Sequence, residues 1–232
     1  MTQKRSSESR RRILIRALAS GLMAAASPIA RAQILGKIPR ALPPGKSIYD
    51  LHGQVGLNGQ TAMPESVISA NHTVSTGKDG RIIFVVGKDA FLLRQNSTLS
   101  MTGRNTLVHT LRLTTGALLM VFGKTEHRLE VPSGTIGIRG TGLYAEAQPE
   151  QSYVCTCYGI TEISAAGTSQ RETIESTHHD APRYLLSDGK DRIRPAPVKD
   201  HTDEELMLIE TLVGRVPPFA LYDEAYGRAL RY

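Results

Sequence analysis

Two cysteines separated by a single residue are the most chemically distinctive feature of the sequence. Cys155 and Cys157 fall in a run typical of a strand, so both thiols face the same side, about 7 Å apart along the chain. His178 and His179 follow downstream, and His201 lies further on. Thiolate and imidazole groups are common ligands of zinc, copper and iron. The sequence therefore predicts a metal or haem site at Cys155, Cys157, His178 and His179, in which only one of the adjacent histidines can face the thiols.

Two other interpretations of these residues stay open. The cysteines fit buried, reduced core residues accompanied by surface histidines, and they also fit a redox-labile pair. A disulfide between them would be strained, because thiols so placed in one extended strand are at the outer limit of bonding distance. The spacing matches no established metal motif. The cofactor is therefore left unknown, with a metal or a haem as one option.

Familiar enzyme motifs are absent from the sequence. It contains no G-x-S-x-G, no H-E-x-x-H, no Walker loop and no glycine-rich strand-to-helix turn for a dinucleotide. Glu162, Glu172 and Glu175 lie on polar strand-like segments, where solvated charge accounts for them. We therefore expect no catalytic residues and no enzymatic activity.

The elements that must position the cysteines are predicted to be strands. From Ser47 onward, runs of β-branched and apolar residues recur at spacings of roughly 8 to 12 residues, each ended by Gly, Asn, Asp or Pro. Gly87 and Gly116 each separate two such runs, and both pairs are predicted to be hairpins. The pattern indicates an all-β meander that forms a sandwich or a solenoid-like β-roll. The predicted strands are 48–57, 66–69, 81–87, 90–95, 107–114, 117–122, 127–131, 135–139, 142–147, 152–158, 160–163, 171–177 and 183–187.

A helix is predicted only near the end of the chain, at about 202–214. Thr202 to Glu205 form a capping box, and apolar residues follow at helical spacing from Leu206 to Val213. Gly214 is a C-terminal stop, with two prolines beyond it. We expect the apolar side of this short amphipathic helix to cover the open end or edge of the sheet; binding to a partner is the alternative.

The positive charge of the chain is concentrated in its first 32 residues. The whole sequence has a net charge of +6, but residues 1–32 hold seven basic residues against Glu8 alone. The remainder has 21 basic and 21 acidic residues and is neutral. No basic patch with interleaved aromatics remains, so we expect no nucleic-acid partner.

The basic N-terminus resembles a twin-arginine export signal. Ser9 precedes Arg10, Arg11, a third arginine and an apolar run, and the segment ends in an A-x-A site that predicts cleavage between Ala32 and Gln33. The apolar run is too short and weak to span a membrane, which takes about 20 apolar residues. A basic tail followed by an amphipathic helix is the alternative. We expect a mature protein without a membrane span, located in the periplasm of a bacterium.

From about residue 48 to 187 the chain resembles the FecR domain family. The resemblance lies in the segments 55–59 (VGLNG), 74–80 (VSTGKDG), 136–142 (IGIRGTG) and 153–159 (YVCTCYG). It implies a periplasmic all-β fold and a role in binding an envelope or periplasmic protein partner. In the most specific segment, Arg139, Gly140 and Thr141 are interpreted as a structural corner rather than a catalytic group. The best-known relatives add a cytoplasmic anti-sigma segment and a transmembrane helix, so signalling by that route is not carried over.

Together these features predict four segments: a signal peptide (1–32), a linker (33–46), a FecR-like β domain (47–187) and a C-terminal extension with the helix (188–232). The expected function is an exported binding, scaffolding or regulatory module without catalytic activity. The alternative is a metal- or haem-binding redox or sensor protein that uses the cysteines and histidines.

Overall fold

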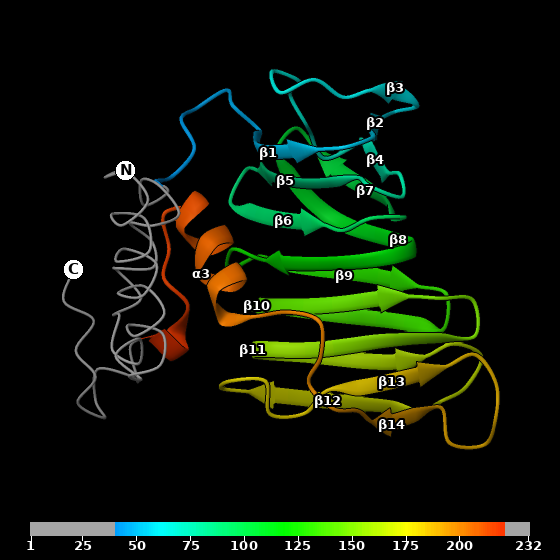
Figure 1. Cartoon of the computed structure of the whole chain (residues 1–232). Coiled ribbons are helices and arrows are strands. Elements are labelled where there is room, and N and C mark those ends of the chain that lie inside the picture. The colour runs from blue at the N-terminus through cyan, green and yellow to red at the C-terminus, as the bar shows by residue number, and fades with distance from the viewer. Residues whose placement is uncertain (1–39, 221–232) are drawn as a thin grey trace, which may run out of the picture. The chain divides into compact units, whose positions relative to one another are not determined.

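The computed structural model of the chain describes residues 40–220 (Figure 1). The signal motif at Arg10 and Arg11, the cleavage site at Ala32 and Gln33, and the first part of the predicted linker fall outside these residues. The prediction of an all-β fold is confirmed, because the described residues form one 14-stranded sheet. Its strands are β1 (Ile48–His52), β2 (Val55–Leu57), β3 (Gln60–Thr61), β4 (Thr73–Thr76), β5 (Arg81–Val86), β6 (Asp89–Leu93), β7 (Thr98–Arg104), β8 (Leu107–Val121), β9 (Glu126–Val131), β10 (Gly134–Ala147), β11 (Gln151–Ala165), β12 (Arg171–Ser176), β13 (Arg183–Leu186) and β14 (Ile193–Pro195).

Three long strands, β8, β10 and β11, hold the sheet together because each pairs with different neighbours along its length. The first half of β8 pairs with β7, and its second half pairs with β6 and β10. Likewise, β10 pairs first with β9 and then with β8, and β11 pairs first with β13 and then with β12. Gly116, Gly140 and Gly159, within these strands, all have positive φ. Glycine adopts a positive φ without steric cost, so each long strand can bend at its glycine. Beyond the bend the strand pairs with a second set of neighbours.

The main core lies on the inner side of the bent sheet. Leu93 and Leu118, which pair between β6 and the second half of β8, belong to one fully buried cluster. The same cluster holds Leu99 and Leu113, which pair between β7 and the first half of β8. The residues that alternate with these along the same strands, such as Leu92 of β6 and Leu119 of β8, belong to a second cluster on the outer side. Because side chains alternate along a strand, the two clusters occupy opposite faces of the sheet.

The predicted hairpin at Gly87 is confirmed, but the one at Gly116 is wrong. β5 and β6 pair as antiparallel neighbours around Gly87. Residues 107–114 and 117–122 instead form the single strand β8, and Gly116 has a φ of 88° in its middle. A Cβ there would lie 2.0 Å from Ser97 Oγ, so the glycine permits a close approach of the chains rather than a reversal.

Other strand boundaries also differ from the prediction. The pairs 135–139 with 142–147, and 152–158 with 160–163, are the continuous strands β10 and β11. Residues 66–69 are not a strand. The sequence pattern missed β3, β4, β7 and β14, which are short or rich in polar residues and contain at most two large apolar side chains each.

The predicted helix is present as α3 (Asp203–Leu212), with Thr202 as its N-cap in a complete capping box. Its buried residues Leu206, Ile209 and Leu212 join the outer cluster with Leu92 of β6 and Leu119 of β8. The helix therefore covers the outer face of the sheet and not its open end or edge as expected, because the apolar residues of β6 and β8 also need cover on that side. No helix within residues 40–220 is long and apolar enough to cross a membrane.

Candidate metal centre

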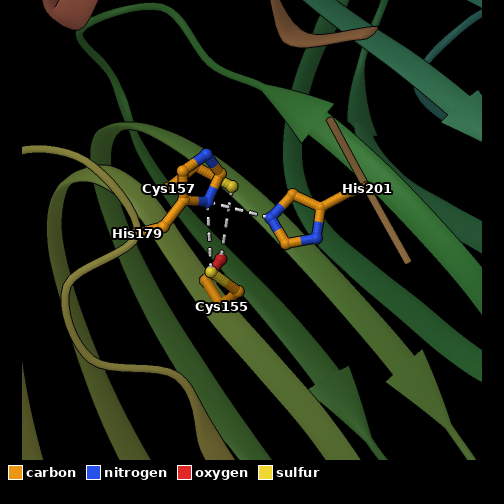
Figure 2. A group of neighbouring side chains, drawn as sticks. All are labelled: Cys155, Cys157, His179 and His201. Carbon is orange, nitrogen blue, oxygen red and sulfur yellow. Dashed lines mark hydrogen bonds between the residues drawn. The ribbon is translucent and has the colours of Figure 1, made fainter. Parts of the chain in front are cut away.

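The two thiols lie side by side on the outer face of β11, where the sequence places them. Cys155 and Cys157 are free and fully buried in the outer cluster, whereas Val154, the residue before Cys155, faces the inner core. Opposite Cys155, β10 contributes Tyr144 to the same outer cluster. The sheet therefore presents both sulfur atoms to whatever segment covers this face (Figure 2).

A tight turn after β12 brings His179 onto the thiols. The Asp180 carboxylate accepts hydrogen bonds from Thr177 N (2.7 Å) and Thr177 Oγ1 (2.9 Å), and these bonds lower the pKa of Asp180. His179 has a φ of 56°, and its backbone N–H donates to Cys157 O at 2.9 Å. This left-handed residue turns the chain so that the His179 side chain faces the cysteines.

His201 reaches the same place from the segment that precedes α3. Tyr153 Oη donates to Pro197 O at 2.9 Å, and Lys199 pairs with Glu146 of β10 at 2.6 Å, so the segment is tied to the sheet. The His201 ring stacks on Tyr144, with ring centres 4.6 Å apart. His201 is thereby held, nearly buried, above the thiols.

The four side chains offer one donor atom each, and these atoms all lie within 4.8 Å of one another. Cys155 Sγ is 3.5 Å from His179 Nδ1, which in turn is 3.0 Å from His201 Nε2 (Figure 2). In a tetrahedral zinc site with bonds of about 2.0 to 2.3 Å, neighbouring donors are about 3.3 to 3.8 Å apart. The observed cluster is therefore within about an ångström of that geometry.

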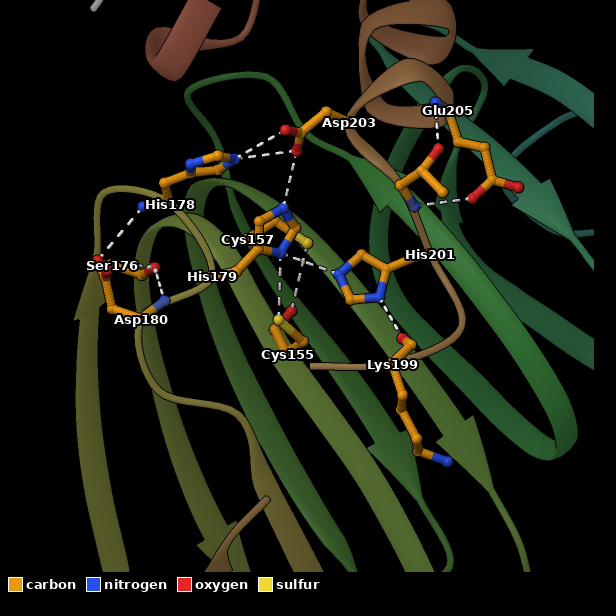
Figure 3. Close-up of polar contacts among 11 residues, drawn as sticks. Cys155, Cys157, Ser176, His178, His179, Asp180, Lys199, His201, Asp203 and Glu205 are labelled. Carbon is orange, nitrogen blue, oxygen red and sulfur yellow. Dashed lines mark hydrogen bonds and ion pairs between the residues drawn. The ribbon is translucent and has the colours of Figure 1, made fainter. Parts of the chain in front are cut away.

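The outer nitrogens of both imidazoles are engaged by acceptors (Figure 3). His201 Nδ1 lies 2.6 Å from Lys199 O, and His179 Nε2 lies 3.1 Å from Asp203 Oδ1. A carbonyl accepts only and a carboxylate oxygen accepts when ionised, so each of these nitrogens carries a proton. In the neutral rings, the lone pairs of His179 Nδ1 and His201 Nε2 then face each other at 3.0 Å. The space between them requires a cation, which is either a proton on one ring or a metal ion.

The electrostatics of the cluster favour a thiolate at Cys155. The hydrogen bond from Cys157, followed by those from His179 and His201, outweighs burial and lowers the pKa of Cys155 to about 4. Burial, reinforced by the neighbouring Cys155, raises the pKa of Cys157. Burial opposes the charging of His179, but Cys155 and Asp203 together raise its pKa. These shifts favour negative charge on Cys155 and positive charge on His179.

The structure brings together three of the four residues expected at the metal site, Cys155, Cys157 and His179, and separates the fourth. His178 is half-exposed, and its Nε2 lies 2.9 Å from Asp203 Oδ1 (Figure 3). It belongs to an outer group with His179 and Asp203 and not to the thiol group.

Two residues of the site, His201 and Asp203, were not predicted from the sequence. His201 supplies a donor, and Asp203 fixes the protonation of His179 from the first turn of α3. The only local signal was the capping box that starts at Thr202, which fixes how the chain enters the helix at this point.

Cys155, His179 and Asp203 also lie in the order of a thiol, imidazole and carboxylate triad. A nucleophile must be reached by its substrate, and Cys155 has 0% of its surface exposed. Its thiolate is also enclosed by the second imidazole, His201, which a nucleophile does not need. The donor set is therefore better suited to a closed metal site than to covalent catalysis.

The Arg139, Gly140 and Thr141 segment lies away from the thiols, where β10 bends. Gly140 has a φ of 54°, and Thr141 Oγ1 donates to Arg139 O at 2.8 Å and lies 3.1 Å from Ile160 O. Arg139 is largely exposed, with its guanidinium 3.3 Å from Glu126. These contacts are those of a backbone corner.

No protein-family model matches the chain, and no curated protein matches its sequence. Among solved structures, two crystal structures of "a putative anti-sigma factor" from Parabacteroides distasonis ATCC 8503 are similar, at 8% sequence identity and with TM-scores of 0.44 and 0.45. Each similarity covers 53% of this chain and 58% of the other chain, so this chain matches less than two thirds of their length. At this identity the likeness concerns backbone arrangement alone.

Proposed function

We propose that this chain is an exported, non-catalytic binding module of FecR type that holds one divalent transition-metal ion at Cys155, Cys157, His179 and His201. The observation that carries the metal is the convergence of two imidazole lone pairs on two thiols, with the outer nitrogen of each ring already donating to an oxygen. Metal-bound histidines characteristically donate their second N–H to a carboxylate or a carbonyl. Asp203 and Lys199 O supply one of each.

Charge balance favours a divalent ion. Two thiolates and two neutral imidazoles carry a total charge of −2, which a divalent ion neutralises, whereas a monovalent ion leaves a net negative charge in a buried site. A buried uncompensated charge is costly. A closed set of two sulfur and two nitrogen donors in near-tetrahedral arrangement is typical of zinc, and Fe²⁺ is the main competitor for such ligands.

A haem fits this cluster less well than a single ion. Haem iron takes its equatorial ligands from the porphyrin and leaves at most two positions for the protein. Here four donors converge within 4.8 Å, and the aromatic ring of Tyr144 packs directly on His201. No plane is left between the donors for a macrocycle.

Export to the periplasm is supported by the sequence alone, through the arginine pair, the apolar run and the A-x-A site of residues 1–32. It is chemically consistent with the metal, because bare neighbouring thiols are readily lost to oxidation in an oxidising compartment. A metal bound before export would protect both cysteines. The FecR-type role, recognition of an envelope or periplasmic protein, is supported by the segments that resemble that family.

Metal analysis of the purified mature protein tests the metal site. Elemental analysis should find one zinc or iron per chain, and the Co²⁺-substituted protein should show the thiolate charge-transfer and intense visible bands of tetrahedral cobalt. Cys155→Ser together with Cys157→Ser should abolish both signals, while His109→Ala, an exposed histidine on β8, should leave them intact. Wild-type protein that stays metal-free after incubation with zinc would refute the metal site and leave the interaction module as the remaining function.

A further inference from the structure

We infer that the bound metal fastens the helix α3 to the outer face of the sheet, so that metal occupancy controls whether this helix is docked. The inference rests on the proposed metal site, and it concerns the regulation that the site makes possible. It follows from which parts of the chain supply the four ligands.

The ligands come from three separate segments. Cys155 and Cys157 belong to β11, and His179 belongs to the turn between β12 and β13, so three donors are built into the sheet. His201 is the exception, because it lies two residues before the first residue of α3. A metal ion bound by all four therefore forms a direct link between the sheet and the start of the helix.

A second contact depends on another of the four ligands, His179. Asp203, the first residue of α3, accepts from His179 Nε2 at 3.1 Å, and His178 lies beside it. Metal binding at Nδ1 holds the His179 ring in place and keeps the proton on Nε2, so it strengthens this contact as well. The first turn of the helix is thus connected to the metal through two residues, His201 and Asp203.

The other polar contacts at the start of α3 are partly exposed ion pairs. Arg94 bonds to Glu205 at 2.9 Å and to Asp200 O at 2.7 Å, and Lys199 bonds to Glu146 at 2.6 Å. About a quarter of both the Arg94 and the Glu205 side chain is exposed. Ion pairs that keep contact with water contribute little each, because solvent screens them. The buried metal link is therefore the strongest polar contact available at this end of the helix.

Without the metal, the cluster works against docking. In the neutral rings, two acceptor lone pairs then face each other in a nearly buried site, those of His179 Nδ1 and His201 Nε2 at 3.0 Å. Buried polar atoms without a bonding partner favour opening to water. Opening would move His201 away and uncover the apolar residues beneath α3, including Leu92 and Leu119.

Hydrogen exchange of the full mature protein with and without metal tests the inference. With free zinc about a hundredfold above its Kd, binding to the closed form alone suppresses opening about a hundredfold. We therefore expect backbone amides of residues 203–212 to exchange about ten to a hundred times more slowly with zinc than with a chelator. Amides of β7, whose buried residues Leu99 and Met101 belong to the inner core, should exchange at the same rate in both conditions.

A variant separates the helix link from metal binding itself. His201→Ala leaves three protein ligands, so zinc should still bind with reduced affinity, but exchange of residues 203–212 should slow much less with zinc than in the wild type, because only the contact through His179 and Asp203 remains. His109→Ala should retain the full response. If the wild type binds no zinc, the proposed metal site has failed; if it binds zinc and the helix exchanges equally fast with and without it, the site stands and only the fastening of α3 is overturned.

Discussion

Replacing Asp203 tests the site through a residue that touches no metal. Asp203 Oδ1 lies 3.1 Å from His179 Nε2, so the carboxylate holds the proton on the outer nitrogen and leaves Nδ1 free as a ligand. Asp203→Asn keeps a carbonyl oxygen that can accept the same hydrogen bond but removes the negative charge. Asp203→Ala removes both the acceptor and the charge.

The size of the effect follows from the exposure of this carboxylate. Loss of the partner of a metal-bound histidine costs about 10- to 100-fold in affinity. The Asp203 side chain is 39% exposed and is shared with His178, so solvent screens part of its charge. We expect Asp203→Asn to weaken zinc binding about tenfold, which corresponds to about 1.4 kcal/mol, and Asp203→Ala to approach a hundredfold.

Zinc affinity is measured by competition with a chromogenic chelator at fixed pH, with circular dichroism as a check on folding. Glu204→Gln is the matched control, because Glu204 is an exposed acid in the same first turn of α3 and belongs to neither group of potential metal ligands. It should change the affinity less than twofold. Equal affinities for the wild type and Asp203→Ala, with the fold intact, would refute the role assigned to Asp203 and weaken the case for His179 as a ligand.

Three further predictions concern protonation, the corner of β10 and export. Zinc binding should release protons, since thiols and a protonated imidazole must give them up; its affinity should rise with pH, and calorimetry in buffers of different ionisation enthalpy should count the protons, with zero release contradicting thiolate ligation. Gly140→Val should destabilise the fold by about 1 to 3 kcal/mol because its φ is 54°, whereas Gly137→Val, where φ is not positive and the new Cβ would lie 3.7 Å from its nearest neighbour, should be nearly neutral; equal urea midpoints would exclude backbone strain at the corner. Lysine at Arg10, Arg11 and Arg12 together should keep the precursor in the cytoplasm, because the export pathway distinguishes guanidinium groups from charge alone; normal periplasmic accumulation of that form would refute the export signal.

The strand content of this fold was predictable because side-chain alternation is a local property. The runs around β5, β6, β9 and β12 are short, apolar or β-branched, and closed by turn residues, and they form strands close to where the pattern places them. The error at Gly116 has an equally local cause. A glycine with positive φ serves either a hairpin turn or a bend within a strand, and the sequence around it is the same in both cases. Whether Gly116 forms a turn or a bend depends on a residue distant in sequence, Ser97, which directly precedes β7 and packs against Gly116.

The position of the thiols was also predictable, because residues i and i+2 of a strand share a face. The choice between His178 and His179 was not, since it depends on the left-handed conformation of His179 and on the hydrogen bonds that Asp180 makes to the turn. A single residue of shift in that turn would exchange the two side chains.

His201 is the residue that favours a metal site among the interpretations that the sequence left open, and its place could not be predicted from spacing. Buried reduced cysteines and a redox-labile pair both require only the two thiols, whereas a metal site requires further donors with their lone pairs free. His201 lies 44 residues after Cys157 in the chain, and it reaches the thiols only because Tyr153, Lys199 and Tyr144 hold its segment against the sheet. Neither alternative explains why a second imidazole, with its outer nitrogen already donating to a carbonyl, should point its remaining lone pair at the first. A cation between them does, and a metal ion would use the two sulfur atoms beside them as further ligands, which a proton does not need.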